Sequence, residues 1–152
     1  MRYWLMKSEP DEFSIDDLVK AKGQTTSWFG VRNYQARNFM RDMKLGERAF
    51  FYHSSCPEPG IAGIVEVSKL AHPDVSQFDP KSDYYDSKSS RDDPRWWNVD
   101  VKLIEKTRLV ALPELRDTPA LANMITLRKG NRLSITPVTS EEWKAVLQLM
   151  KR

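Results

Sequence analysis

The sequence predicts an α+β protein: a small mixed or antiparallel β-barrel of about five to six strands with short helices packed around it. Two observations support this fold class. Segments with strand patterns are interrupted by short helical ones, and they do not alternate as in the strand–helix–strand units of a parallel α/β sheet. The length of 152 residues, without a repeat or a Gly/Ser linker, favours a single domain over 1–152.

The first predicted elements are a strand and a helix. Residues 2–7 (RYWLMK) are apolar enough for a mostly buried strand, which should end before Pro10 because proline has no backbone donor. A helix is predicted over about 15–22, because Ser14 and Asp17 have the spacing of a capping box at its start. These elements place a turn between the strand and the helix.

A second helix should begin at Tyr34 and end at Gly46. Asn33 lies directly before it and is a favoured N-cap residue. The apolar residues of this segment recur at helical spacing, which predicts one buried face made of Ala36, Phe39, Met40 and Met43.

Strand patterns dominate the middle of the chain. Residues 47–54 and 61–70 are rich in apolar and β-branched residues and flank the turn segment 56–60, which predicts a hairpin. The polar stretch 72–95 is too long for an ordinary connection, and such loops are usually functional or disordered. Residues 96–109 restore the alternation of a strand.

The C-terminal part predicts one strand and one helix. Residues 132–138 (RLSITPV) form the last predicted strand. Thr139 and Glu142 form a second capping box, which opens a helix. The apolar face of this helix consists of Trp143, Val146, Leu147 and Met150.

Composition places weak limits on function. The formal net charge of +3, from 24 Lys and Arg against 21 Asp and Glu, is compatible with an anionic partner without requiring one. No apolar run is long enough to cross a bilayer, and the N-terminal segment does not resemble a signal peptide. Cys56 is the only cysteine, which indicates a reducing compartment. We expect a cytoplasmic protein, or a nuclear one in a eukaryote, without a membrane partner.

The sequence contains no specific catalytic or metal-binding motif. His53, Cys56 and His72 lack the paired spacing of a zinc site. A G-x-S-x-G motif and a glycine-rich phosphate loop are also missing. We therefore expect no bound metal, no cofactor and no catalytic residue, and we interpret both histidines as polar contacts or surface groups.

The segment SWFGVRN, residues 27–33, fits neither a buried strand nor an amphipathic helix, because Trp28 and Phe29 are adjacent and cannot share a face. Trp28 supplies a flat wall, Gly30 permits close backbone approach, and Asn33 offers donors and an acceptor for a base edge. Stacking plus edge hydrogen bonds is how single-stranded or extruded bases are recognised. The residues alone leave two interpretations open: a recognition loop, or a tryptophan in the core followed by a helix cap.

Long motifs in the chain resemble the EVE domain family: WLMKSEPDEFSIDDL, SWFGVRNYQARNFMRDM, FFYHSSCPEPGIAGIVEV, DPKSDYYDSKS and PRWWNVDVK, continuing through RLSITPVT. The resemblance covers nearly the whole chain and implies a PUA-like fold. It also implies a non-catalytic reader of modified bases, because the family includes bacterial single-domain proteins and a eukaryotic nuclear protein associated with modified cytosine in DNA.

The resemblance also assigns site residues. Lys7 and Ser8 resemble the pair that ends the first strand of the related YTH domains, beside their base pocket, and Trp28 resembles the pocket tryptophan. The expected base pocket consists of Ser8, Trp28, Gly30, Val31, Asn33, His53 and Ser54. Candidates for a second aromatic wall, which match no family motif, are Tyr84, Tyr85 and Trp97. Phosphate contacts are expected from Lys7, Arg32 and Arg37.

We therefore expect the chain to bind a modified base in nucleic acid, of the cytosine type, such as 5-methylcytosine in DNA, or a base in RNA. The alternative is a small-molecule enzyme that acts on modified nucleosides, as in the PUA-like ASCH relatives. Such an enzyme needs an acid and a base in the pocket, and Lys7 with Glu9 is the only pair near it. A protein-interaction module would instead expose an apolar patch.

Overall fold

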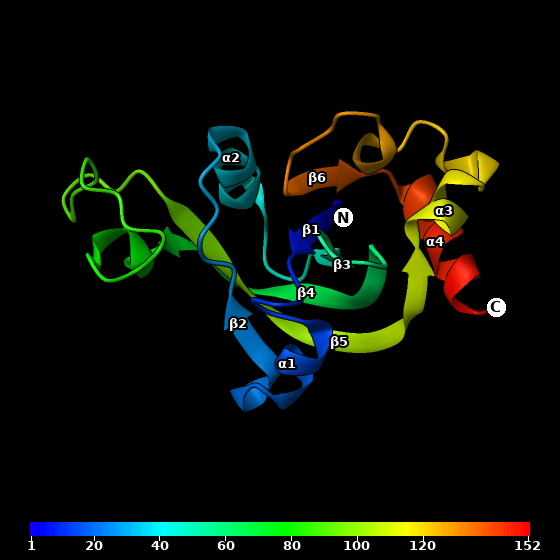
Figure 1. Cartoon of the computed structure of the whole chain (residues 1–152), viewed down its shortest axis with the longest axis horizontal. Coiled ribbons are helices and arrows are strands. Elements are labelled where there is room, and N and C mark those ends of the chain that lie inside the picture. The colour runs from blue at the N-terminus through cyan, green and yellow to red at the C-terminus, as the bar shows by residue number, and fades with distance from the viewer.

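The apolar segments of the chain form one six-stranded mixed sheet in the computed structural model, which describes residues 1–152 (Figure 1). The strand order is β2-β5-β4-β3-β1-β6. The strands are β1 (Tyr3–Ser8), β2 (Thr25–Ser27), β3 (Arg48–His53), β4 (Gly60–Pro73), β5 (Trp97–Ala111) and β6 (Ile135–Val138). The helices are α1 (Ile15–Lys20), α2 (Tyr34–Asp42), α3 (Leu112–Arg116) and α4 (Ser140–Met150), with short 3₁₀ turns η1 (Lys22–Gln24), η2 (Val75–Phe78), η3 (Pro119–Leu121) and η4 (Ile125–Leu127).

The α+β fold class is confirmed, but the sheet is not closed into a barrel. Strand β2 pairs only with β5, and β6 pairs only with β1. Strand β2 is three residues long, and the chain turns at Gly30, whose φ of +84° lies in the left-handed region that favours glycine. The sheet therefore keeps two free edges, one at β2 and one at β6.

The pairing of β1 brings distant parts of the chain together at one edge of the sheet. Strand β1 is parallel to β3 and antiparallel to β6. The carboxyl ends of β1 and β3 and the amino end of β6 therefore lie on the same side. Ser8 is opposite His53 in the ladder, and the Lys7 amide donates to the Ser134 carbonyl over 2.8 Å.

Both faces of the central strands are buried, which explains why their sequences are apolar at successive positions. In β1, Trp4 and Met6 belong to a core that includes residues of α1 and α2. Leu5 belongs to a second core, which includes α4. Trp143 of α4 stacks there on Phe50 of β3 with a centroid distance of 4.0 Å. The side chains of β1 thus alternate between two cores.

The helix starts follow the sequence prediction. Both capping boxes are present, Ser14 with Asp17 at α1 and Thr139 with Glu142 at α4. Helix α1 is shorter than predicted because η1 follows directly, with Gly23 at a φ of 65°. The short strand β2 after η1 was not predicted from the sequence.

The predicted hairpin is present as the antiparallel pair β3 and β4. Strands β4 and β5, 14 and 15 residues long, curve along the sheet, and β5 leads upward to α3 and α4 (Figure 1). This curvature gives the open sheet its barrel-like form. No helix has the length and the apolar composition that a membrane span requires.

Candidate functional site

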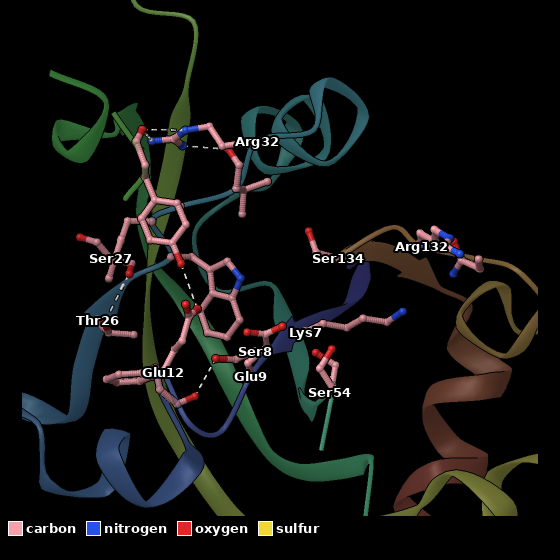
Figure 2. A pocket seen from close by; sticks show the side chains of 18 residues that line it. Lys7, Ser8, Glu9, Glu12, Thr26, Ser27, Arg32, Ser54, Arg132 and Ser134 are labelled. Carbon is pink, nitrogen blue, oxygen red and sulfur yellow. Dashed lines mark hydrogen bonds between the residues drawn. The ribbon is translucent and has the colours of Figure 1, made fainter. Parts of the chain in front are cut away.

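A cavity of about 860 Å³ opens at the sheet edge where β1 and β3 end (Figure 2). One side is formed by Thr26 and Ser27 of β2 and the segment that follows them, and the other by the residues that lead into β6. The floor includes Lys7 and Ser8 at the end of β1. The cavity therefore lies between the two unpaired edges of the sheet, and its volume is within the range of small-ligand sites.

Trp28 belongs both to the core and to the cavity wall. Its side chain is 7 % exposed, and its ring meets Phe51 edge-on at a centroid distance of 5.3 Å. The ring also lines the cavity. The indole N–H makes no hydrogen bond within the protein, and it is not fully buried, because no fully buried polar side-chain atom lacks a partner. Trp28 thus packs in the core and also lines a cavity, and its role as a recognition residue stays a prediction.

Tyr84 forms an aromatic wall beside Gly30. A Cβ atom on Gly30 would lie 2.8 Å from the Tyr84 ring, so the ring packs directly against the glycine backbone. The ring meets Phe29 edge-on at 5.8 Å, and its hydroxyl donates to Glu12 over 2.9 Å. Burial, together with the Glu12 carboxylate, raises the pKa of Tyr84 to about 12. Tyr84 is thus the one candidate for a second wall that lines the cavity.

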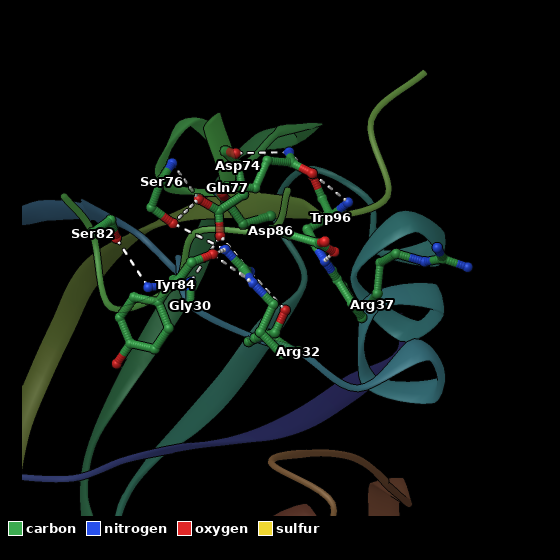
Figure 3. A network of polar contacts seen from close by, with 12 residues as sticks. Gly30, Arg32, Arg37, Asp74, Ser76, Gln77, Ser82, Tyr84, Asp86 and Trp96 are labelled. Carbon is green, nitrogen blue, oxygen red and sulfur yellow. Dashed lines mark hydrogen bonds and ion pairs between the residues drawn. The ribbon is translucent and has the colours of Figure 1, made fainter. Parts of the chain in front are cut away.

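A buried carboxylate fixes the backbone around this wall (Figure 3). The side chain of Asp74 is 1 % exposed and accepts hydrogen bonds from the Gly30 amide at 2.8 Å and from Arg32 Nη1 at 3.1 Å. Ser76 donates its amide and its hydroxyl to the other carboxylate oxygen, at 2.9 and 2.6 Å. Arg32 also donates to the Tyr84 carbonyl, with Nη2 at 2.7 Å. This network positions Gly30 and Tyr84 relative to each other.

Gln77 orders the remainder of the long polar segment 72–95. Its Nε2 donates to the carbonyls of Asp74 and Trp96, both at 2.7 Å. Its Oε1 accepts from the Trp96 amide and the Ser89 hydroxyl. The segment is therefore held by buried polar contacts that its sequence pattern did not reveal.

Polar groups converge on the cavity from the strand ends. The ammonium of Lys7 makes no ion pair, and burial lowers the pKa of this lysine. Ser54 and Ser134 line the cavity with hydroxyls that make no hydrogen bond within the protein. Ser8 also lines it, although its hydroxyl donates to the Phe13 carbonyl over 2.6 Å. The side chains of these residues surround one space in Figure 2.

Two expected pocket residues lie outside the cavity and serve local structure. Asn33 is exposed and caps α2, with its Oδ1 accepting from the Ala36 amide at 2.9 Å. His53 does not line the cavity, because its Nε2 accepts from the Ile15 amide at 3.1 Å. Burial lowers the pKa of His53, which favours the neutral ring that this hydrogen bond requires.

Tyr85 and Trp97, the other candidates for a second wall, are also elsewhere. Tyr85 is exposed and does not line the cavity. The Trp97 indole donates to the Pro94 carbonyl over 3.2 Å, and its ring lies under Arg41 at 5.0 Å. Each is part of the surface around the β5 start and the preceding segment.

Both arginines expected to hold phosphates are engaged within the protein. Arg32 lines the cavity, but its donors serve Asp74, Ser76 and Tyr84. Arg37 lies outside the cavity and donates to the Arg95 carbonyl over 2.8 Å. Their proximity to Trp28 in sequence therefore does not make them free cations.

Several lining residues were missed by the sequence analysis. Thr26 and Ser27 directly precede Trp28, so their neighbourhood was a usable signal. The residues before β6 are far from Trp28 in sequence, and only the β1–β6 pairing brings them to the cavity. The residues before β6 that line the cavity are Asn131, Arg132 and Ser134, and the other missed lining residues are Glu12, Phe13, Phe29 and Ser55.

Two polar clusters near the cavity have contacts of their own. Lys7 and Glu9 both line the cavity, but no hydrogen bond or ion pair joins them. Asp100 Oδ1 accepts from Ser27 Oγ at 2.6 Å and lies 2.8 Å from His72 Nε2. The carboxylate thus lies between serine and histidine, whereas a serine nucleophile needs the imidazole next to its hydroxyl. No group of three or more metal-ligating side chains is present.

Comparison with known proteins agrees with the PUA-like fold. A family model described as the EVE domain matches residues 2–149. Human thymocyte nuclear protein 1 is 46 % identical over 168 residues, covering 99 % of this chain and 74 % of the human protein. The structure of the human THYN1 protein in complex with 5-methylcytosine-containing DNA matches with a TM-score of 0.95 and 46 % identity, covering 100 % of this chain and 99 % of that chain.

Two further structures extend the comparison. A protein from Pseudomonas putida matches with a TM-score of 0.93 and 47 % identity, covering 97 % of this chain and 99 % of that chain. The YTH domain of Zygosaccharomyces rouxii MRB1, in complex with N6-methyladenosine RNA, matches with a TM-score of 0.55 at 17 % identity, covering 99 % of this chain and 85 % of that chain. At this identity the likeness concerns the fold alone.

Proposed function

The chain belongs to the EVE domain family, and from this premise we propose that it is a non-catalytic module that binds a modified nucleobase in nucleic acid. The observation that carries the proposal is the Trp28 ring, which lines a cavity while its indole N–H has no partner within the protein. A flat aromatic surface with a free donor at its edge suits a planar heterocycle.

The two aromatic walls support base stacking. Trp28 lies on one side of the cavity and Tyr84 lines it as well, fixed by Gly30 and Glu12. Every base has a π-face, so stacking supplies affinity, and hydrogen bonds to the base edge supply selectivity. Aromatic walls alone would accept any base.

The groups that would read the base edge are the free polar ones. Ser54 and Ser134 offer hydroxyls that can donate or accept, and Lys7 and the Trp28 indole offer donors. Ser8 keeps only acceptor capacity, because its hydrogen is committed to the Phe13 carbonyl. Gly30 and Val31 would shape the wall next to Trp28.

The base must reach this cavity outside a double helix, because a stacked and paired base cannot enter it. We therefore propose that the ligand is an extruded base in DNA or a base in a single strand. Among the relatives, the human THYN1 protein was crystallised with 5-methylcytosine-containing DNA, which supports a modified cytosine as the preferred base.

The test is a titration of oligonucleotides that contain 5-methylcytosine or plain cytosine. Trp28→Ala should weaken binding about 5- to 150-fold, since stacking of one base is worth on the order of 1–3 kcal/mol. Trp28 also packs on Phe51, so the alanine variant needs a folding check because such a truncation costs about 3–5 kcal/mol of stability.

Trp28→Phe separates binding from packing. It keeps an aromatic ring in the core and removes the indole N–H, so binding of the modified base should weaken about 2- to 10-fold. Trp97→Phe is the matched control, because Trp97 lies outside the cavity and should leave the affinity unchanged. If both Trp28 variants bind the modified oligonucleotide as tightly as the wild type, the proposal is wrong.

The proposal contains no catalytic step. Turnover of acylated nucleosides by the wild type, lost in Lys7→Ala, would instead favour the enzyme alternative.

A further inference from the structure

We infer that the loop 128–132, named here the basic loop, binds the phosphates next to the base held in the cavity. The inference rests on the proposed function and replaces Arg32 and Arg37 as the expected phosphate contacts. It predicts that the nucleic-acid backbone leaves the cavity along the loop that leads into β6.

The basic loop carries three cations with no partner inside the protein. Arg128, Lys129 and Arg132 are exposed, and none of their side chains takes part in a hydrogen bond or an ion pair. Arg32 and Arg37, by contrast, already donate hydrogen bonds to Asp74 and to backbone carbonyls. Free cations on a fixed loop are suited to phosphate binding because no existing contact has to break.

The loop is held in place by an internal amide. Asn131 donates its Nδ2 to the Ile125 carbonyl at 3.1 Å, and its Oδ1 accepts from the Leu133 amide at 3.1 Å. Gly130 has a φ of +80°, which allows the tight turn. The backbone is therefore ordered before a ligand arrives, which lowers the entropic cost of binding.

The loop separates two cavities. Asn131 lines both the main cavity and a second one of about 400 Å³, which lies against Gln35 and Phe39 of α2. Arg128 and Lys129 line the second cavity, and Arg132 lines the first. A strand that places one base in the main cavity and continues over the loop would thus carry its next nucleotide to the second cavity.

The charges around the main cavity favour this direction. Figure 2 shows Lys7 extending toward the side where Arg132 lies, whereas Glu12 lies on the opposite side, near Thr26. Phosphates leaving over Lys7 and Arg132 meet two cations beside the one carboxylate of Glu9, whereas phosphates leaving over Glu12 meet a carboxylate. This uneven distribution of charge favours the basic loop as the path of the nucleic-acid backbone.

The test compares two triple variants across a salt series with single-stranded oligonucleotides, one containing 5-methylcytosine and one containing cytosine. The loop variant is Arg128→Ala, Lys129→Ala and Arg132→Ala. The control variant is Lys22→Ala, Lys69→Ala and Lys144→Ala, which removes the same charge from exposed positions that line neither cavity. Thermal unfolding confirms that each variant is folded.

The expected result is a change of salt dependence. Three lost phosphate contacts should reduce the slope of log K against log salt by about 2–3. The wild type should therefore lose about 16- to 64-fold more affinity than the loop variant between about 50 and 200 mM salt. Each single variant should reduce the slope by about 1. Affinities for both oligonucleotides should fall by the same factor, leaving their ratio unchanged.

The outcomes separate the two proposals. Equal slopes for the loop variant and the control variant would overturn the basic-loop inference, as would wild-type binding that does not depend on salt. A wild type that does not distinguish the two oligonucleotides, with a reduced slope in the loop variant alone, would refute modified-base recognition and keep the loop as the backbone contact.

Discussion

Gly30 is the position where a single methyl group should disturb the cavity most. Its φ is +84°, and a Cβ there would lie 2.8 Å from Cζ of Tyr84. In Gly30→Ala the backbone strain costs roughly 1–2 kcal/mol. The Tyr84 ring must also move, which endangers its edge contact with Phe29 and its hydrogen bond to Glu12.

Gly46 provides a matched control for the strain alone. Its φ is +85°, and nothing lies within 4 Å of its would-be Cβ. Gly46→Ala should therefore lose roughly 1–2 kcal/mol. Gly30→Ala should lose a further 1–3 kcal/mol or so, from about 0.5–1.5 for the aromatic pair and about 0.5–1.5 for the hydrogen bond.

The assay is thermal unfolding of both variants beside the wild type, followed by titration with the 5-methylcytosine oligonucleotide. For a chain of this length the extra loss corresponds to a melting temperature about 2–12 °C below that of Gly46→Ala. Gly30→Ala should also bind more weakly, because one wall has moved. Equal melting temperatures for the two variants, with wild-type binding by Gly30→Ala, would refute the idea that Gly30 is required for the Tyr84 wall.

Two further changes test how the site is supported. Arg32→Ala should lower the free energy of unfolding, measured by urea denaturation, by about 3 kcal/mol, because the buried Asp74 carboxylate loses its cation. Arg128→Ala removes an unpaired cation and should change the free energy of unfolding by less than about 0.5 kcal/mol. Similar losses in both variants would contradict the supporting role of Arg32. Burial, opposed by Asp16, lowers the pKa of folded His53, so the unfolded chain binds the proton more readily. The stabilisation from neutral His53 should therefore be complete above the unfolded pKa of about 6.5 and be lost as the pH falls through the lower folded pKa. His53→Gln should flatten that slope in urea titrations over this pH range, and an unchanged slope would exclude His53 as its source.

Local signals in the sequence predicted local structure well. The capping boxes at Ser14 and Thr139 and the N-cap at Asn33 are present, because such hydrogen bonds depend only on residues within one helical turn. The buried strands were equally visible, since a strand covered on both faces is apolar at successive positions.

The contents of the cavity were harder to predict, because they depend on which distant residues meet. Arg32 was expected to bind phosphate, but nothing in the sequence around it revealed that Asp74 would be buried beside it. Ser134 and Arg132 reach the cavity only through the β1–β6 pairing. His53 was expected in the cavity from its place at the end of β3, yet the Ile15 amide holds its ring elsewhere.

The two unpaired sheet edges also determine how the site can adapt. Because no ladder hydrogen bond joins β2 to β6, the distance between these rims is set by side chains and turns. A base with a bulkier modification could widen the cavity opening without breaking a hydrogen bond between strands of the sheet. Within this architecture, ligands of different size can thus be accommodated by exchanging rim side chains, while the strands and both cores stay as they are.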